Sequence, residues 1–411
     1  MPAPLSRPPL KSLDEALAEL LGHALPLERA EAISTFDADG RVLAQDVVAE
    51  LDVPAHDNSA MDGYAVRSSD WSNAATALCV NQRIAAGSTG TALAAMSAAR
   101  IFTGAPIPLG ADAVVMQEDC TLVEPGSVRI ALKPQAGQWI RKRGEDVTSS
   151  RTVLSKGDLL SPQSIGLAAS IGYAKLSVAS PVRVALFSTG DELVMPGDVA
   201  PTDMLPGAIY NSNRFFLRAL LQRLGCQVTD MGIVPDKLEA TKAALANASS
   251  SHDLVLTSGG VSVGEEDHIK PAVQALGQLN LWQIAIKPGK PFAYGKIGQA
   301  HFMGLPGNPV SSFVTFLLLV RPFIRKLQGG THFAPESIAA CAHFTWARAD
   351  KRREFLRVKR NLAGGLDLFE NQSSGVLTSA VWADGLVDNP AGKAIAHGDV
   401  VQFIPFSSLM S

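Results

Sequence analysis

The sequence predicts a multidomain protein in which a doubly wound, mostly parallel α/β domain lies between β-rich regions. Between about Pro181 and Leu327, apolar strand-like runs alternate with helical stripes of apolar residues. On either side, short strand-like runs are separated by turns rich in Gly and Pro. With 411 residues, of which 46% are hydrophobic and 18% charged, the chain has the length and composition of several globular domains.

The N-terminal part begins with one helix and continues as short strands. Residues 12–22 are predicted to be helical because Ser12 and Glu15 make a capping box, apolar side chains share one face and Gly22 can close the helix. As far as about Val147 the pattern is then typical of a small β-rich domain. A helical segment follows at residues 161–171.

The central part alternates strands and helices. Helical patterns lie around residues 216–224, after residue 236, where Asp236 and Glu239 can cap the helix, and at 308–327. The predicted strands are residues 182–187, 228–234, 253–256, 281–286 and 301–303. After Gly329-Gly330, strand-like runs at residues 354–359, 366–369 and 400–404 predict a small antiparallel barrel of about 80 residues.

Four polar turns are expected at one edge of the central sheet, where open α/β sheets bind ligands. They are Ser188-Thr-Gly-Asp-Glu192, Thr257-Ser-Gly-Gly-Val-Ser-Val-Gly264, Lys287-Pro-Gly-Lys-Pro291 and Leu305-Pro-Gly-Asn-Pro309. A Gly- and Ser-rich turn between a strand and a helix presents backbone N–H groups to an anion such as phosphate. Two such turns, at 257–264 and 305–309, indicate a ligand with more than one anionic group, although each could instead be a tight turn that needs its glycines.

Charged and polar side chains in these turns suggest what the ligand carries. Lys287 and Lys290 flank a rigid Pro-Gly turn and could face one small oxyanion, or lie in a solvated loop. Asn308 and the pair Ser311-Ser312 could contact an anion at a helix start, or simply cap that helix. Carboxylates beside phosphate-binding turns commonly hold Mg²⁺, and Asp62, Asp146, Asp191, Glu192 and Asp267 are such candidates, although each taken alone is more typical of an ordinary turn residue. Helix capping accounts for Asp236.

Several function classes are excluded by the composition. The net charge of −3 offers no general attraction to nucleic acid or membrane, and the basic cluster at 348–360 is better explained as a strand face reaching an anion site or as solvated surface. The longest apolar run is too short to span a bilayer, and no secretory signal is seen. The four scattered cysteines predict buried free thiols in a reducing cytoplasm. Motifs of serine hydrolases, P-loop proteins and dinucleotide-binding proteins are absent.

Taken together and in this order, eight motifs resemble the molybdopterin molybdenumtransferases of molybdenum cofactor synthesis, over nearly the whole chain. They are Asp57-Asn-Ser-Ala-Met-Asp-Gly-Tyr-Ala-Val66, Phe102-Thr-Gly-Ala-Pro-Ile-Pro-Leu-Gly-Ala-Asp-Ala-Val-Val115, Arg143-Gly-Glu-Asp146, Ser188-Thr-Gly-Asp-Glu-Leu193, Asn211-Ser-Asn213, residues 257–267, residues 287–291 and residues 304–311.

The resemblance implies a fold of four domains. An elongated discontinuous domain would comprise residues 1–50 and 142–180, a β-rich inserted domain residues 51–141, the α/β molybdopterin-binding domain residues 181–328 and a C-terminal β-barrel residues 329–411. It also implies an elongated homodimer with the cleft near the subunit interface, and as further partners the adenylyltransferase of the same pathway and chaperones of molybdoenzymes.

The chemistry implied by the resemblance is the insertion of molybdate into adenylylated molybdopterin, with Mg²⁺-assisted release of AMP. Catalytic roles then fall to Asp62, Thr103, Asp146, Glu192, Asp236 and Asp267, with Glu192 and Asp267 as metal ligands. Cofactor-binding residues would be Thr189, Gly190, Asn211, Ser258, Gly259, Gly260, Ser262, Gly264, Pro306, Gly307, Asn308 and Pro309. The molybdate pocket would comprise Lys287, Lys290, Pro291, Ser311, Arg352 and Ser374, with Arg353 and Ser373 as adjacent alternatives.

One departure and two alternatives stand beside this resemblance. Gln283 occupies a position where relatives often carry Lys, which removes one cationic contact. The adenylyltransferase that precedes this step resembles residues 181–327 alone, and the motif at 57–66 and the extra domains argue against it. A non-catalytic scaffold of the same fold would need a partner-binding module or a long linker, and neither is seen.

Overall fold

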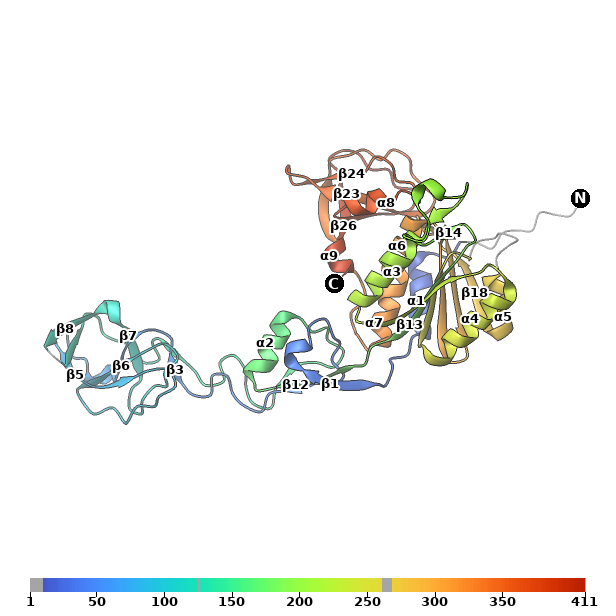
Figure 1. Ribbon diagram of the computed structural model, residues 1–411. Coiled ribbons are helices and arrows are strands. Elements are labelled where there is room, and N and C mark those ends of the chain that lie inside the picture. Colours follow the sequence, from blue (N-terminus) through green and yellow to red (C-terminus); the bar gives the residue numbers. More distant parts are fainter. Residues whose placement is uncertain (1–9, 125, 261–267, 411) are drawn as a thin grey trace, which may run out of the picture.

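The computed structural model describes residues 10–124, 126–260 and 268–410. The molecule is elongated, with a β-rich lobe at one end, a slender middle segment, and an α/β domain joined to a barrel at the other end (Figure 1). Among these residues no helix is long and apolar enough to cross a membrane.

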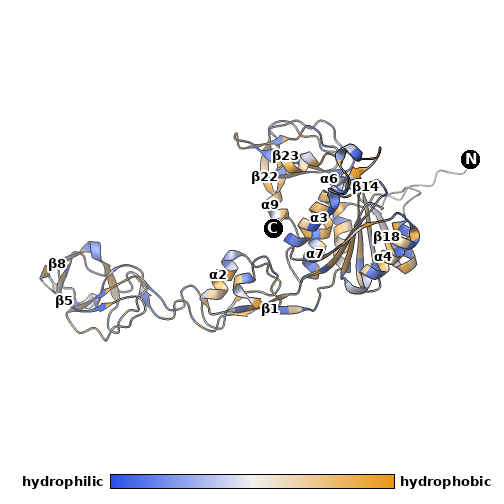
Figure 2. Ribbon diagram, in the orientation of Figure 1, coloured by the Kyte–Doolittle hydropathy of each residue, from blue (hydrophilic) through white to orange (hydrophobic). Residues whose placement is uncertain are grey.

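The α/β domain is built on a six-stranded sheet in the order β16-β13-β17-β21-β20-β18. Four neighbouring strands are parallel, namely β16 (Gln227–Val234), β13 (Arg183–Thr189), β17 (Leu254–Ser258) and β21 (Ala300–Leu305). The last two strands of this order, β20 (Pro291–Ile297) and the edge strand β18 (Gly277–Gln283), are antiparallel to their neighbours. The sheet is therefore mostly parallel, as predicted, and its strands are largely hydrophobic because both faces are covered (Figure 2).

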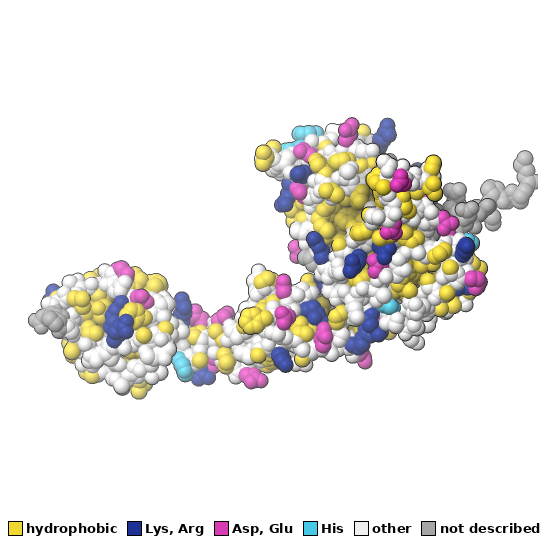
Figure 3. All heavy atoms as spheres, in the orientation of Figure 1, with side chains coloured by type: hydrophobic (Ala, Val, Ile, Leu, Met, Phe, Trp, Pro, Cys, Tyr) yellow, Lys and Arg dark blue, Asp and Glu magenta, His cyan; other side chains and the backbone are white. Residues whose placement is uncertain are grey.

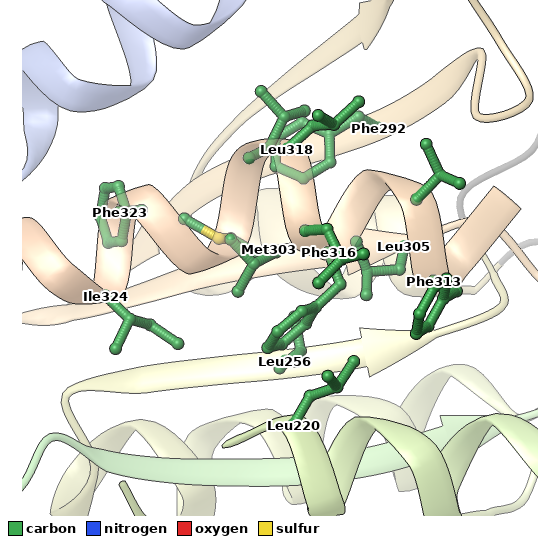
Figure 4. Close-up of a cluster of buried hydrophobic side chains, with 14 of the residues drawn as sticks. Leu220, Leu256, Phe292, Met303, Leu305, Phe313, Phe316, Leu318, Phe323 and Ile324 are labelled. Carbon is green, nitrogen blue, oxygen red and sulfur yellow. The ribbon is translucent and has the colours of Figure 1, made fainter. Parts of the chain in front are cut away.

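Helices cover both faces of this sheet. One face packs against α1 (Leu13–His23), α3 (Ser212–Arg223) and a continuous helical rod of α6 (Pro309–Thr315), the π-helical segment η5 (Phe316–Val320) and α7 (Arg321–Leu327). Figure 4 shows Phe313, Phe316 and Ile324 of this rod among side chains of the strands and of α3. The other face packs against α4 (Leu238–Ser251) and α5 (Ile269–Leu276).

Two predictions about helix ends need correction. The capping box of Ser12 and Glu15 is present, but α1 continues through Gly22 and ends before Ala24. Helix α4 begins after Lys237, and no side chain caps it, so Asp236 is not the N-cap residue. The capping explanation of Asp236 is therefore wrong.

The β-rich lobe is one mixed sheet in the order β7-β4-β6-β5-β9-β8. Its strands are β4 (Gly63–Val66), β5 (Ala77–Ile84), β6 (Ser97–Ile101), β7 (Ala113–Met116), β8 (Cys120–Glu124) and β9 (Ser127–Ile130). Hydrophobic clusters lie on both of its faces. Cys79 falls on an exposed position of β5, and of the four cysteines expected to be buried only Cys226 is.

The middle segment is formed by two stretches of chain that run beside each other. Strand β1 (Ala30–Ser34) pairs with β12 (Lys175–Ala179), β2 (Val47–Val48) with β11 (Thr152–Leu154), and β3 (Asn58–Ser59) with β10 (Ile140–Arg141). Helix α2 (Pro162–Ser170) covers part of it. The predicted domain boundaries stay a prediction, but α1 shares the core of the α/β sheet and not that of the middle segment.

The C-terminal domain is a closed barrel of five strands. They are β22 (Ile338–Ala342), β23 (Arg353–Arg360), β24 (Gly365–Leu368), β25 (Gly385–Asn389) and β26 (Val400–Pro405), and β23 closes the barrel by pairing with both β24 and β25. The strand predicted at 281–286 is split in two, because β19 (Ile286–Lys287) leaves the α/β sheet and pairs with β23. This short strand joins the barrel to the α/β domain.

A buried histidine lies where α1 meets the sheet. His301 on β21 is 8% exposed, and its Nδ1 lies 3.0 Å from the hydroxyl of Tyr294 on β20. Burial raises the pKa of Tyr294 to about 12, so its hydroxyl keeps its proton. Burial, with lesser effects from Lys296 and His23, lowers the pKa of His301 to about 4, and the imidazole is neutral in the folded protein.

We expect His301 to make the fold sensitive to acid. Its folded pKa lies below the usual value of 6.5, so the unfolded chain binds the additional proton, and stability falls as the pH drops from about 6.5 towards 4. The difference in unfolding free energy between wild type and the non-titrating variant His301→Gln should narrow by up to about 3 kcal/mol over this range. Denaturant unfolding at several pH values measures it, with the exposed His56→Gln variant as control. A difference that is independent of pH would show that His301 is not buried as a neutral group.

Candidate active site at the carboxyl edge of the sheet

A cavity of about 520 Å³ opens beyond the carboxyl ends of β13, β17 and β21. It brings together turns that are far apart in the sequence. Of the residues predicted to bind the cofactor, ten line it, namely Thr189, Gly190, Asn211, Ser258, Gly259, Gly260, Pro306, Gly307, Asn308 and Pro309. Glu192, Asp236, Pro291 and Ser311 also line it.

The turn after β13 places a carboxylate in this cavity. Gly190 has φ 142°, and a Cβ atom built on it would lie 2.6 Å from a carboxylate oxygen of Glu192. Only glycine therefore lets the Glu192 side chain fold back over the turn. The neighbouring Asp191 accepts a 3.4 Å hydrogen bond from the backbone N–H of Asp236, which ties the turn after β16 to the turn after β13.

The turn after β17 is packed too closely for any side chain. Gly259 and Gly260 have φ values of 93° and 67°, in the left-handed region. A Cβ on Gly259 would lie 2.8 Å from the carbonyl oxygen of Thr189, and one on Gly260 would lie 2.6 Å from Cγ1 of Ile269. This backbone thus fits tightly against β13 and α5. Ser262, Gly264 and Asp267, which were predicted to continue the turn, lie outside the described residues.

Asn213, in the first turn of α3, connects two of the cavity turns. Its Nδ2 donates hydrogen bonds of 2.7 Å to Oγ of Ser258 and 2.7 Å to the carbonyl oxygen of Gly307. The Asn-Ser-Asn motif at 211–213 is part of the family resemblance, but the sequence predicted no role for Asn213. The sequence did contain a signal for this role, namely a second Asn just inside the start of a helix. One Asn, Asn211, is already sufficient as the N-cap residue.

Several buried polar atoms around the cavity have no hydrogen-bond partner within the described part of the chain. These are Oγ of Ser188, Oγ1 of Thr189 and Thr257, and Nδ2 of Asn211. Buried polar groups in proteins are nearly always hydrogen-bonded, and an orphan group calls for an explanation such as an absent ligand. Because Thr189 and Asn211 also line the cavity, this edge is suited to a polar ligand.

A loop of the barrel contacts the start of the helical rod. Asn308 is the N-cap residue of α6 but makes no side-chain cap bond, which excludes the simple capping role. Instead the backbone N–H of Val310 donates a 2.9 Å hydrogen bond to the carbonyl oxygen of Ser374. Ser374 is thereby bonded to the residue that precedes the cavity residue Ser311 in the chain. Ser374 itself does not line the cavity.

The two predicted molybdate lysines differ in their surroundings. The ammonium of Lys287 lies 3.0 Å from the buried carboxylate of Glu354 and 3.3 Å from Asp350. Lys290 has no side-chain hydrogen bond or ion pair with any residue that the structure describes. Lys287 is therefore a link to the barrel, whereas the charge of Lys290 is uncompensated by a direct partner.

Arg352 belongs to the same charged group. It donates from Nε and Nη2 to the two carboxylate oxygens of Asp350, at 3.0 Å each, and these bonds hold the pKa of Asp350 well below its usual range. The alternative Arg353 is engaged elsewhere, with Asp388 at 2.5 Å and Asp14 at 3.0 Å. Neither lysine nor Arg352 lines the cavity. Lys287 lies on β19, which pairs with β23 of the barrel.

Three predicted catalytic residues are not brought to this cavity within one chain. Asp62 accepts hydrogen bonds of 2.8 Å from the backbone N–H and the hydroxyl of Thr103, and these bonds lower the pKa of Asp62. This pair belongs to the β-rich lobe. Asp146 lies where the lobe joins the middle segment, and its backbone N–H donates a hydrogen bond to the carbonyl oxygen of Val53. The lobe is at the far end of the molecule from the α/β domain (Figure 3).

Comparison with known proteins gives a consistent result along the chain. Residues 11–172 match the family described as the MoeA N-terminal region (domain I and II), residues 185–326 the probable molybdopterin binding domain, and residues 339–406 the MoeA C-terminal region (domain IV). A protein of Haemophilus influenzae named molybdopterin molybdenumtransferase is 43% identical over 84% of this chain and 85% of its own length. Molybdopterin molybdenumtransferase 2 of Mycobacterium tuberculosis is 35% identical over 91% and 93%.

Solved structures agree with these matches. A molybdopterin biosynthesis MoeA protein from Pyrococcus horikoshii OT3 superimposes with a TM-score of 0.84 at 28% identity, over 97% of this chain and 100% of the other. A second structure of a MoeA protein from the same species gives a TM-score of 0.77 at 31% identity, over 97% of this chain and 99% of the other. The arrangement of the β-rich lobe, α/β domain and barrel is thus that of MoeA.

We expect Gly260 to be essential to the shape of the cavity. Gly260→Ala should lower the unfolding free energy by at least about 1 kcal/mol, because alanine is strained in the left-handed region and its Cβ would collide with Ile269. Gly307→Ala is the matched control, since the nearest atom to its Cβ is Cα of Gly259 at 4.0 Å. Denaturant unfolding compares the two variants. Equal stability of both would refute the tight fit of the turn after β17.

Proposed function

This chain belongs to the MoeA family of molybdenum cofactor biosynthesis, and we propose that it is a molybdopterin molybdenumtransferase that inserts molybdate into adenylylated molybdopterin and releases AMP. The observation that carries the proposal is the cavity at the carboxyl edge of the α/β sheet, where three glycine-containing turns and buried polar donors meet. The substrate carries phosphate groups and a polar pterin, which is the kind of ligand that these donors suit.

In this proposal the ligands are bound by two groups of residues, one within the cavity and one at its margin towards the barrel. Thr189, Asn211 and the turn after β17 supply donors for the phosphates and the pterin. Lys290, with Ser311 and the barrel loop around Ser374, supplies the charge and hydrogen bonds for molybdate, a tetrahedral dianion. Lys287 and Arg352 act through Asp350 and Glu354, which fix the barrel beside the molybdate end.

The residues present also fit a divalent metal ion bound together with substrate. Mg²⁺ is commonly held by one or two carboxylates and by the phosphates of the substrate, not by an all-protein cage. Within the described residues no group of three or more metal-binding side chains occurs, but the carboxylate residues Glu192 and Asp236 both line the cavity. We propose that Glu192 and Asp267 hold Mg²⁺, which when bound would neutralise charge on the phosphoanhydride that is cleaved.

We further propose that the working enzyme is a homodimer in which a second copy supplies Asp62, Thr103 and Asp146. The support is geometric, because these residues lie in or near the β-rich lobe, far from the cavity of their own chain (Figure 1). The resemblance implies a cleft near the subunit interface, which would bring the lobe of one copy to the cavity of the other. The adenylyltransferase of the pathway, molybdoenzyme chaperones and a cytoplasmic location remain predictions.

The adenylyltransferase alternative accounts for less of the chain. It would leave the matched N-terminal region at 11–172 and the C-terminal region at 339–406 without a role. Incubation of the purified protein with adenylylated molybdopterin, molybdate and Mg²⁺ tests the proposal. Release of AMP together with formation of molybdenum cofactor is the expected result, and consumption of ATP with adenylylation of molybdopterin would overturn it.

Glu192→Gln should slow AMP release at least about 10-fold, a loss of about 1.4 kcal/mol of transition-state stabilisation. The change keeps the size of the side chain over Gly190 and removes only its charge, so the Mg²⁺ concentration for half-maximal rate should rise as well. Metal titrations of AMP release measure both effects. Glu239→Gln, at an exposed position of α4, is the control. An unchanged metal requirement in Glu192→Gln would make Glu192 an ordinary turn residue.

Lys290→Ala should raise the molybdate concentration for half-maximal cofactor formation roughly 10- to 100-fold, because a hydrogen bond to a charged group contributes about 1.5–3 kcal/mol. Affinity for adenylylated molybdopterin should change much less, since its phosphates are assigned to the residues within the cavity. Lys296→Ala, at an exposed position of β20, the strand that follows Lys290, is the matched control. An unchanged molybdate requirement, or an equal loss for both ligands, would refute the role of Lys290.

A further inference from the structure

A buried arginine lies in the wall of the barrel that faces the α/β domain. Arg357 on β23 is 1% exposed, and it is among the largest side chains that the protein buries completely. Successive side chains of a strand point to opposite faces. Leu356 and Val358 belong to the core of the barrel, whereas Phe355 belongs to the same hydrophobic cluster as Phe313 of the helical rod. Arg357 therefore lies on the outer face of β23, which the barrel turns towards the α/β domain.

The guanidinium of Arg357 is held by three oxygen atoms. Its Nε donates to Oγ of Ser379 on α8 (Leu377–Trp382) at 3.1 Å. Its Nη1 donates to the carbonyl oxygen of Phe355 at 3.2 Å, and its Nη2 to that of Ser373 at 3.3 Å. Burial lowers the pKa of Arg357 to about 10, so the group is still charged at neutral pH. A charge that has lost its water needs such hydrogen bonds, and one of them comes from the loop that carries Ser373.

The backbone of Arg357 is bonded to the same loop. We call residues 369–376, which connect β24 to α8, the 369–376 loop. The backbone N–H of Arg357 donates to Oε1 of Gln372 at 2.9 Å, and Nε2 of Gln372 donates to the carbonyl oxygen of Arg357 at 3.0 Å. That carbonyl also accepts a 3.1 Å hydrogen bond from the backbone N–H of Phe369. With the bond to Ser373, Arg357 makes four hydrogen bonds to this loop.

The 369–376 loop reaches the candidate active site at the start of α6. The backbone N–H of Val310 donates to the carbonyl oxygen of Ser374 at 2.9 Å. Val310 is the second residue of α6, and the first N–H groups of a helix have no partner within the helix itself. The next residue, Ser311, lines the cavity. The position of Ser374 relative to Ser311 is therefore set by the loop, and the loop is held by Arg357.

The turn that carries Lys290 packs against the same helix. Gly289 has φ 112°, and a Cβ atom built on it would lie 2.5 Å from Oγ1 of Thr315 on α6. A residue with a side chain would not fit there, so the backbone of this turn lies directly against the helix. The turn 287–291 and the 369–376 loop are thus both fixed against α6.

We propose that Arg357 is a positioning residue for molybdate, because it holds the 369–376 loop against α6. In this position Ser374 and Ser311 bind the same oxyanion, to which Lys290 supplies a charge. The inference rests on the proposed function, in which these three residues are assigned to molybdate. Arg357 is fully buried and acts through the loop, not by touching the anion. A guanidinium suits this task better than an ammonium, because its donors point in fixed directions to several acceptors at once.

Hydrogen exchange and molybdate titration of the full-length protein test this role together. Arg357→Lys keeps the positive charge but cannot bond all three acceptors. The amide of Val310 should therefore exchange at least about 10-fold faster, and the molybdate concentration for half-maximal cofactor formation should rise roughly 10-fold. The rate at saturating molybdate and the affinity for adenylylated molybdopterin should change by no more than about 2-fold. Arg360→Lys, at an exposed position of the same strand, is the matched control and should behave as wild type does.

Two further variants separate positioning from a general contribution to stability. Arg321→Lys changes another buried arginine, on α7, and should lower the melting temperature without changing the molybdate requirement. Gln372→Met removes the other attachment of the loop while Arg357 stays in place. It should also raise the molybdate requirement, which keeps the test decisive if Arg357→Lys does not fold.

Three results would contradict the role of Arg357. They are an unchanged exchange rate at Val310, an unchanged molybdate requirement in both loop variants, and an equal rise of that requirement in Arg321→Lys. If the wild type forms no cofactor, the proposed function is wrong. The exchange rate at Val310 then still decides whether Arg357 holds the loop against α6.

Discussion

The close contact between the turns after β13, β17 and β21 is the constraint on which the rest of the site depends. Gly259 lies directly against the carbonyl oxygen of Thr189, and the amide of Asn213 joins Ser258 to Gly307. These contacts are made by backbone and by one short side chain, so the turns have little freedom to move apart. A ligand in the cavity therefore meets donors that are already in place, which reduces the ordering cost of binding.

The barrel takes part in this site although its strands lie outside the α/β sheet. Strand β19 pairs with β23, and the ammonium of Lys287 lies between Glu354 and Asp350, so the turn that carries Lys290 is attached to the barrel at two points. Glu354 is 1% exposed and also accepts a 2.8 Å hydrogen bond from Trp346. A buried carboxylate needs such partners, and its need for them fixes the position of the barrel relative to the cavity.

The elongated shape of the molecule separates two groups of polar residues that the family chemistry would use together. Asp62 and Thr103 form a preformed pair in the β-rich lobe, whereas Glu192 and Asp236 face the cavity at the other end. Rigid pairing of β1 with β12 in the middle segment keeps these ends apart within one chain. Two copies of the chain are the means that we propose for bringing such groups together.

The sequence by itself determined the local features and much of the fold. Alternation of strands and helices between Pro181 and Leu327 predicted the mostly parallel sheet, and topology alone then predicted that the turns 188–192, 257–264 and 305–309 share one edge, because parallel strands end on the same side. The capping box of Ser12 and Glu15 could also be predicted from the sequence, since it depends only on two residues that are three positions apart. The resemblance of eight ordered motifs identified the family.

Only the tertiary structure decided which side chains meet across distant segments. It gave Asn213 its bridging role, split residues 281–286 between two sheets, and paired Lys287 with carboxylates 63 and 67 positions later in the chain, at Asp350 and Glu354. It also showed that Asp236 does not cap α4, and that the side chain of Arg321 is buried. Such facts depend on the packing of whole domains against each other, and neither the spacing nor the type of residues along the chain specifies that packing.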